Sequence, residues 1–245
     1  MKQLNIILLC AYSARSNAYL QAISQHQKLK HQIKAIVTYG EDNYSIQSER
    51  QLSPVVLEAL FCPDLTLPIS DVIDSFDCAK THIEQKFLEN PSLQQTLASY
   101  EPDIIIYSGY GGQIVPESIL GLANVLHVHS GYLPNFRGST TLYHEVIEHS
   151  QCAASAIYLE KDIDTGPILN RERYPLPPKG MDVDYLYDNL IRADLLVKTL
   201  VQIINNYQQV MPQHSEMPAY YIIHPLLKHL ALFKIDAQNE GLNHD

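Results

Sequence analysis

The stretch LNIILLC at residues 4–10 is a short, continuous apolar run, and a polar turn and a helical pattern over residues 16–25 follow it. An apolar run of this length ahead of a helix is typical of a buried strand in a parallel sheet. The same order recurs, with strands predicted at residues 33–38 and 103–108 (DIIIYS) and a largely helical segment over residues 77–99. The repetition predicts an α/β fold with a doubly wound, mostly parallel sheet.

The second half of the chain continues this pattern. Further strands are predicted at residues 124–129 and 153–159 (AASAIYL), the latter from its small and apolar residues. Apolar residues then recur at helical spacing over residues 182–206, which predicts one long helix. We therefore expect a main domain at residues 1–206 and a short helical extension at residues 207–245.

The tail beyond Pro212 contains a predicted short strand at residues 220–223 and a predicted amphipathic helix at residues 225–233. Three roles for this tail stay open at the level of sequence. It covers the core, it contributes to a homodimer contact, or it lines a binding site.

Length and composition restrict the class of protein. The chain has 245 residues, of which 46% are hydrophobic and 18% charged, as expected for one large α/β domain with or without a short appendage. No run approaches the roughly 20 apolar residues of a membrane span. The start, Met1-Lys2-Gln3-Leu4, leads into the first strand without a cleavage site, so we expect a complete, cytoplasmic protein that binds no membrane.

Charge and cysteine usage exclude further classes. The formal net charge is -10 and no cluster of Lys and Arg stands out, which argues against nucleic acid as a partner. Cys10, Cys62, Cys78 and Cys152 form no CxxC pair, so neither a zinc ribbon nor a disulfide framework is indicated.

Three loops follow predicted strands, at the edge where ligands bind in sheets of this kind. The first, SGYGGQ at residues 108–113, is rich in glycine, which allows close approach of the backbone to a ligand. An ordinary turn explains it equally well.

The second loop begins within a predicted strand and reads HVHSGYLPNFRG at residues 127–138. Residues two apart in a strand face the same way, so His127 and His129 point together. Two histidines in a polar rim, or a metal site completed by a carboxylate, are alternatives to a catalytic role.

The third loop, DIDTGP at residues 162–167, places Asp162 and Asp164 at a turn, where acidic residues usually cap or face solvent. The order of four motifs along the chain favours a functional role for these aspartates instead. A glycine loop, a histidine strand, an LPxxRG turn and a DTGP turn follow one another along the chain.

In this order the chain resembles the folate-dependent formyltransferases, which include methionyl-tRNA formyltransferase, glycinamide ribonucleotide formyltransferase and the nucleotide-sugar N-formyltransferases. The resemblance covers roughly residues 4–170, and in size the chain is closest to the sugar enzymes. It implies that His129 and Asp164 are the catalytic histidine and aspartate. His127 stands where the family has asparagine, and the resemblance implies the same catalytic role for it.

The resemblance implies transfer of a formyl group from 10-formyltetrahydrofolate to a primary amine, without a metal. His127 and His129 would donate hydrogen bonds to the oxygen that becomes negative during attack. Asp164 would pair with a charged His129, and Asp164 or the pair would accept the proton of the amine.

The binding residues follow by position. The folate would contact two loops, at Gly109, Tyr110, Gly111, Gly112, Gln113, Ile114 and Val115 and at Asp162 and Ile163. An anionic group of the acceptor would bind where the first helix opens, at Arg15, Ser16 and Asn17, and Arg137 is a further substrate contact. For Ser16 and Asn17 a helix N-cap is the alternative.

The acceptor is expected to be a small-molecule amine, most specifically a nucleotide-linked amino sugar. The relatives that act on tRNA carry a barrel domain after the catalytic domain, and roughly 75 residues after Leu169 are too few for a long helix and such a barrel. Phenol rings that would stack on a base or sugar are available at Tyr12, Tyr110, Tyr132 and Tyr143. The alternatives are a formyltetrahydrofolate hydrolase, a non-catalytic folate- or nucleotide-binding protein, and a metal-dependent enzyme.

Overall fold

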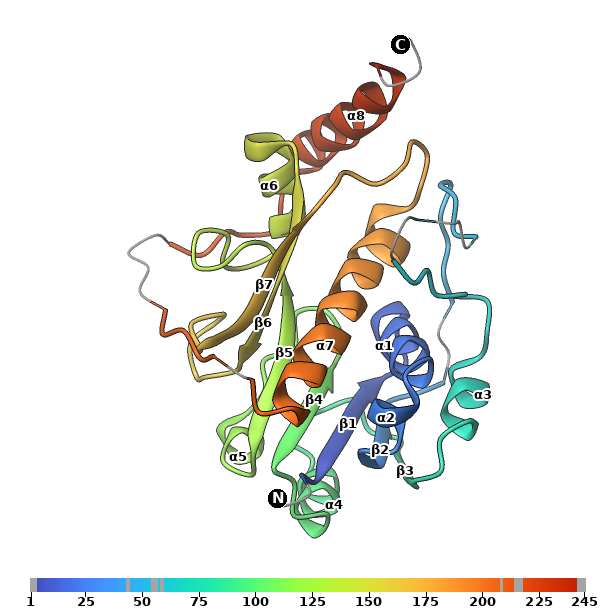
Figure 1. Ribbon diagram of the computed structural model, residues 1–245, viewed down its shortest axis with the longest axis vertical. Coiled ribbons are helices and arrows are strands. Elements are labelled where there is room, and N and C mark those ends of the chain that lie inside the picture. Colours follow the sequence, from blue (N-terminus) through green and yellow to red (C-terminus); the bar gives the residue numbers. More distant parts are fainter. Residues whose placement is uncertain are drawn as a thin grey trace.

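One seven-stranded sheet in the order β3-β2-β1-β4-β5-β6-β7 forms the centre of the computed structural model (Figure 1). The structure describes residues 4–42, 45–53, 57, 60–207, 209–213 and 218–241. Met1, Lys2 and Gln3, which precede the predicted first strand, lie outside the described residues.

The first five strands pair in parallel, and β6 pairs antiparallel with both β5 and β7, so β6 runs opposite to the other six strands. Their bounds are β1 (Ile6–Ala11), β2 (Ile33–Tyr39), β3 (Ala79–Ile83), β4 (Ile104–Ser108), β5 (Asn124–Ser130), β6 (Cys152–Tyr158) and β7 (Ile168–Tyr174). Because β1 pairs with β2 on one side and with β4 on the other, the strand order reverses there, and such a reversal leaves a crevice at the carboxyl ends of the strands. The predicted doubly wound, mostly parallel sheet is confirmed.

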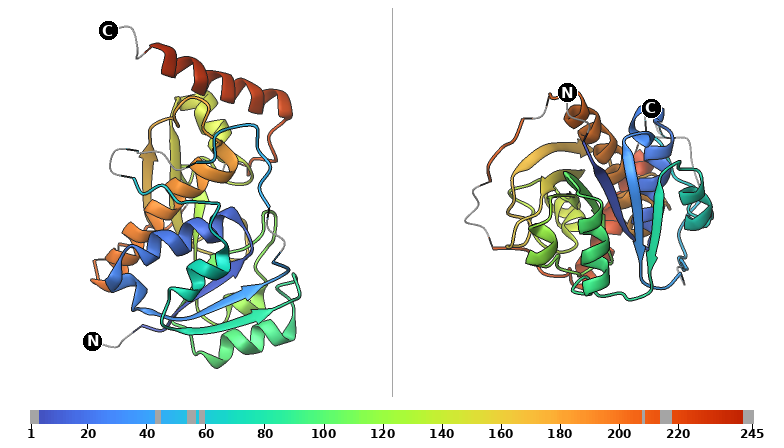
Figure 2. Two further views of the ribbon diagram at one scale, coloured as in Figure 1. Left: turned by 90° about the vertical axis from the view of Figure 1, so that its right-hand side faces the viewer. Right: turned by 90° about the horizontal axis from the view of Figure 1, so that it is seen from below.

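Helices cover both faces of the sheet, because successive residues of the central strands face opposite sides and nearly all are apolar. Leu8 packs under α1 (Ala14–Ser24) and α7 (Asp188–Ile204), whereas Leu9 faces α4 (Pro91–Ser99). Figure 2 shows α1 and α4 on opposite sides of the sheet. The shorter helices are α2 (Gln27–Lys30), α3 (Ile69–Asp74), α5 (Glu117–Leu120) and α6 (Thr141–His149).

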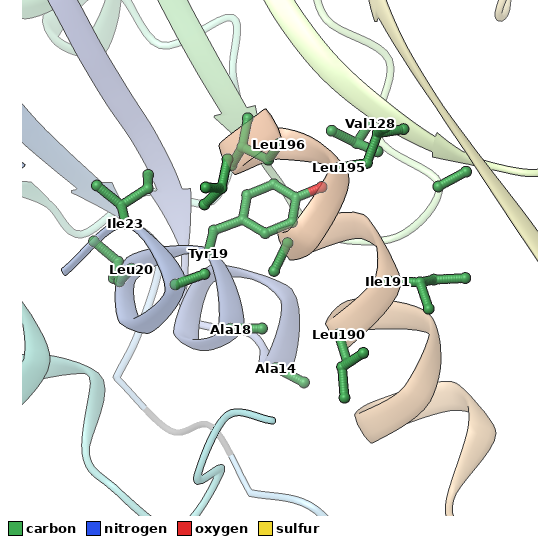
Figure 3. Packing of buried hydrophobic residues seen from close by; sticks show 14 of the residues in the cluster. Ala14, Ala18, Tyr19, Leu20, Ile23, Val128, Leu190, Ile191, Leu195 and Leu196 are labelled. Atoms are coloured by element: carbon green, nitrogen blue, oxygen red, sulfur yellow. The ribbon is translucent and has the colours of Figure 1, made fainter. Parts of the chain in front are cut away.

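Two helices far apart in the sequence, α1 and α7, lie side by side over the sheet. Figure 3 shows the Tyr19 ring between them, with Leu195 and Leu196 of α7 beside it. All three side chains are fully buried. This packing holds the beginning of α1 and the beginning of α7 at the same edge of the sheet.

Three predicted elements need correction. Residues 77–99 were expected to be largely helical, but they form the edge strand β3 and then α4, which starts only at Pro91. The long helix over residues 182–206 is preceded by a π-helical turn, η1 (Val183–Tyr187), before α7 begins. Residues 220–223 form no regular strand, and Tyr220 makes only an isolated bridge to Gly138.

The predicted C-terminal helix is present as α8 (Pro225–Gly241) and packs beside α6 at the end of the molecule (Figure 1). Ala231 and Ile235 on α8 are buried, while Leu226 and Phe233 are exposed. None of the helices in the described part of the chain has the length and apolar character needed to cross a membrane. The domain boundary at residue 206 stays a prediction.

Cys10 and Cys152 lie in the core, and burial raises the pKa of both thiols, that of Cys10 to about 12. Neither thiol is therefore ionised at neutral pH, as suits side chains that only fill space.

Candidate active site

A cavity of about 600 Å³ opens at the carboxyl ends of β4 and β5 and extends to the start of α7. This volume lies within the range of small-molecule sites in enzymes, roughly 300–1,000 Å³. Its wall brings together His127, His129 and Asp164, which come from β5 and from the loop after β6. The predicted side-by-side placement of the two histidines is confirmed.

His129 and Asp164 form a buried pair. Nδ1 of His129 lies 3.3 Å from Oδ2 of Asp164, and the two side chains are 5% and 10% exposed. Nε2 of His129 lies 2.6 Å from the carbonyl oxygen of Phe136. A carbonyl only accepts hydrogen bonds, so Nε2 carries a proton, and a second proton on Nδ1 would face the carboxylate.

The DTGP turn holds Asp164 in an unusual backbone conformation. Asp164 has φ 53°, in the left-handed region, and its Oδ2 accepts the Gly138 N–H at 3.0 Å. Two residues later, a Cβ on Gly166 would lie 1.7 Å from the carbonyl oxygen of Tyr158, so only glycine fits. The turn thus aims the carboxylate at His129 through its backbone.

One expected role of His129 is corrected by this geometry. Nδ1 faces Asp164 and Nε2 faces Phe136 and the Thr141 hydroxyl, which lies 3.2 Å away. Both ring nitrogens therefore face protein groups, and neither is left to donate directly to a formyl oxygen.

His127 differs from its neighbour in both charge and contacts. Its Nδ1 is buried and makes no hydrogen bond within the described residues. Burial, followed by the charges of Arg192, Arg15 and His129, holds the pKa of His127 well below its usual range. A neutral imidazole with an unpartnered buried nitrogen on a cavity wall is a polar group that a bound ligand would satisfy.

Most of the residues expected to hold the folate lie on the cavity wall. They line it from two loops, with Tyr110, Gly111, Gly112, Gln113, Ile114 and Val115 after β4, and Asp162 and Ile163 after β6. A Cβ on Gly111 or Gly112 would meet nothing within 4 Å, so this loop borders open space. Gly109 is absent from the wall, and its carbonyl oxygen accepts the Nη2–H of Arg15 at 2.7 Å.

Of the residues expected to bind the substrate at the start of α1, only one lines the cavity. Arg15 lines the cavity. Ser16 and Asn17 do not: both are fully buried, with Ser16 bonded to Ser108 and Asn17 donating to the Leu67 carbonyl at 2.8 Å. Their backbone N–H groups are also engaged, with the N-cap Ser13, so the anion site expected at Ser16 and Asn17 is corrected to interior packing.

Arg137 and two of the four tyrosines expected near the site lie away from the cavity. Arg137 does not line it, and its carbonyl oxygen accepts the Tyr220 N–H at 2.7 Å. Of the four tyrosines, Tyr110 and Tyr143 line the cavity. Tyr12 packs edge-on against His82, and Tyr132 packs under the guanidinium of Arg173.

Sequence reasoning missed a polar cluster at the inner end of the cavity. Arg192 donates to Asp188 at 3.0 Å and to the Val128 carbonyl at 2.8 Å, and the Ser130 hydroxyl donates to the other oxygen of Asp188 at 2.5 Å. Asp188 and Arg192 stand four residues apart on the predicted helix, which was the available signal. Ser130 and Thr141 also line the wall.

Among the residues that the structure describes, no three His, Cys, Asp or Glu side chains are grouped closely enough to hold a metal ion.

Most of the sequence matches a known family. The model of the formyl transferase family matches residues 5–204. The chain belongs to this family. Within it, the chain is 28% identical over 130 residues to a methionyl-tRNA formyltransferase from Sulfurovum sp., an alignment that covers 53% of this chain and 41% of that protein. The chain thus spans less than half the length of that curated relative.

Solved structures share the fold of this chain. A glycinamide ribonucleotide transformylase from Symbiobacterium toebii superposes with a TM-score of 0.58 at 15% identity, covering 86% of this chain and 95% of that one. A sugar N-formyltransferase from a Shewanella species superposes with a TM-score of 0.59 at 14% identity, covering 94% and 87%. At such identities the likeness is one of fold.

Proposed function

We propose that the protein transfers a formyl group from 10-formyltetrahydrofolate to a primary amine of a small metabolite in the cytoplasm. The observation that carries this proposal is the buried His129–Asp164 pair beside His127, whose Nδ1 is unpartnered, on the wall of one cavity. Membership of the formyl transferase family supports the same reaction.

The cavity suits the folate. Its volume, about 600 Å³, is that of a small-molecule site. Ile114 and Ile163, 64% and 54% exposed, lie on the two loops that line the cavity and offer apolar surfaces to a flat ring. When bound, 10-formyltetrahydrofolate supplies an electrophilic formyl carbon, and residues 110–115 with Asp162 and Ile163 would hold it.

His127 and Asp164 take separate roles in this proposal. His127 is neutral, and a neutral imidazole donates one N–H, which here would stabilise negative charge on the reacting oxygen. Asp164 accepts the proton that the amine loses after attack, and His129 stabilises the carboxylate from Nδ1. His129 thus acts through Asp164.

The acceptor that we propose is a nucleotide-linked amino sugar. Arg15 and Arg192 line the same cavity and would offset the negative charge of its phosphates, and Nε of Arg15 is buried without a hydrogen-bond partner in the described part of the chain. Tyr110 and Tyr143 present rings on the wall for stacking.

The test is release of tetrahydrofolate from 10-formyltetrahydrofolate, without an acceptor and with a panel of nucleotide-linked amino sugars. Acceptor-dependent release with a mass gain of one formyl group supports the proposal and names the substrate. Release without an acceptor indicates a hydrolase, and bound folate without turnover indicates a binding protein. His129→Ala should abolish nearly all release while leaving the far-ultraviolet circular dichroism spectrum intact.

A further inference from the structure

The segment before α8 is fastened to the loop over residues 136–139 by two main-chain hydrogen bonds. The Tyr220 N–H donates to the Arg137 carbonyl at 2.7 Å, and the Ser139 N–H donates to the Tyr220 carbonyl at 2.9 Å. Between them, a Cβ on Gly138 would lie 2.2 Å from the Tyr220 carbonyl oxygen. The close approach of the two backbones therefore requires glycine at position 138.

The side chain of Tyr220 adds to this attachment. Its ring stacks on the ring of Phe136, with centroids 5.7 Å apart and an interplanar angle of 10°. Its other contacts are with α6, where the ring of His144 lies 4.4 Å away and Glu148 accepts the Tyr220 hydroxyl at 3.1 Å. Tyr220 thus joins the loop to a helix of the main domain.

The same loop supplies the two backbone groups that hold the catalytic pair. The Phe136 carbonyl accepts from Nε2 of His129, and the Gly138 N–H donates to Oδ2 of Asp164. Phe136 contacts Tyr220 through its ring, and Gly138 lies against the Tyr220 backbone. A shift of Tyr220 would therefore move the backbone partners of both His129 and Asp164.

We propose that Tyr220 is a positioning residue for the His129–Asp164 pair, holding the loop whose Phe136 carbonyl and Gly138 amide orient the two side chains. The catalytic role of this pair rests on the proposed function, whereas its orientation by the loop is a feature of the fold. The C-terminal segment thereby becomes part of the active site.

The first experiment measures positioning without any substrate. Ring nitrogens and their protons are observed by NMR in the full-length chain labelled at histidine, and His129 is assigned from the spectrum of His129→Gln. In Tyr220→Ala we expect the Nε2 proton of His129 to exchange faster with water and its nitrogen shift to change. Tyr220→Phe keeps the stacked ring and should preserve the signal.

Tyr221→Ala is the matched control, because the adjacent Tyr221 side chain is 89% exposed. Gly138→Ala should reproduce the effect of Tyr220→Ala, since its Cβ pushes against the Tyr220 carbonyl. An unchanged His129 signal in Tyr220→Ala, or an equal change in Tyr221→Ala, overturns the proposal.

The second experiment measures turnover with 10-formyltetrahydrofolate and the acceptor that the panel of nucleotide-linked amino sugars identifies. Tyr220→Ala should lower kcat by about 10- to 100-fold with KM for the folate unchanged, as expected for a small misplacement of catalytic groups, and Tyr220→Phe should restore it. A raised KM with unchanged kcat overturns the proposal. If the wild type shows no turnover but His129 responds to Tyr220→Ala alone, the positioning is supported and the proposed function fails.

Discussion

The carboxylate of Asp164 lies between two partners, because its Oδ2 is 3.3 Å from Nδ1 of His129 and 3.0 Å from the Gly138 nitrogen. One partner is a backbone donor with a fixed charge state, and the other is an imidazole that can gain a proton. The carboxylate is therefore fixed in place by the first and electrostatically coupled to the second.

Replacing Asp164 by Asn should separate the two interactions of the carboxylate, its hydrogen bond from Gly138 and its coupling to His129. The amide oxygen of Asn still accepts the Gly138 N–H, but it neither accepts a proton nor pairs with a charged imidazole. We expect kcat to fall by about 10²- to 10⁴-fold with little change in melting temperature. Steady-state kinetics and calorimetry check this, with Asp74→Asn as a control because that side chain is 77% exposed on α3. Turnover near the wild-type level in Asp164→Asn would contradict the proton-accepting role.

His127→Asn introduces the asparagine expected at this position from the resemblance to the folate-dependent formyltransferases. The amide also donates to the reacting oxygen, so turnover should be retained or rise. Because burial and the neighbouring cations hold the pKa of His127 well below its usual range, its ring is neutral at neutral pH, and the substitution should leave the pH profile from neutral pH upward unchanged. A collapse of activity would show that His127 has a role that asparagine does not serve.

Glu145→Gln should stabilise the protein at alkaline pH. Glu145 is fully buried, and burial raises its pKa to about 7, although the Tyr132 N–H that it accepts lowers it. Between pH 4.5 and 7 the unfolded chain ionises first, so the folded state loses stability as pH rises. Gln removes this loss, worth about 3 kcal/mol at pH 8.

Urea unfolding at pH 5 and pH 8 checks the expectation for Glu145, with the exposed Glu89→Gln as the control. A gain of equal size at both pH values would show that ionisation of Glu145 is not its cause.

Gly166→Ala should be severely destabilising, because its Cβ would lie 1.7 Å from a backbone oxygen, that of Tyr158, which cannot rotate away. We expect a loss of about 3 kcal/mol in the free energy of unfolding, together with loss of turnover as Asp164 moves. Chemical denaturation checks this against Gly121→Ala, whose Cβ would meet its nearest neighbour at 3.3 Å. Wild-type stability in Gly166→Ala would contradict the geometry of the turn.

The sequence predicted the interior of the sheet well and its edges poorly. The central strands β1 and β4 are buried on both faces, so their apolar runs coincide with the strands to within about two residues. The two strands that were missed, β3 and β7, are the edges of the sheet. Edge strands carry polar side chains such as Lys80 and Arg171, and their pattern resembles that of a loop or a helix surface.

The site was predicted where its residues belong to a motif. His129 and Asp164 follow from the order of motifs along the chain, and the structure brings them together. Asp188 and Arg192 were missed, because an i,i+4 pair is usual on a solvated helix surface and only the packing of α7 buries it here. Ser16 and Asn17 are polar residues at a helix start, and only tertiary contacts distinguish an interior bond from a binding group.

Ile222 stands on the cavity wall two residues after the bridge between Tyr220 and Gly138. The attachment there is made by the main chain and side chain of Tyr220 and by Gly138, and Ile222 takes no part in these contacts. The Ile222 side chain can consequently be replaced without breaking the hydrogen bonds that attach the segment. The part of the cavity wall that Ile222 forms is therefore separable from the contacts that hold the loop of Phe136 and Gly138 in place.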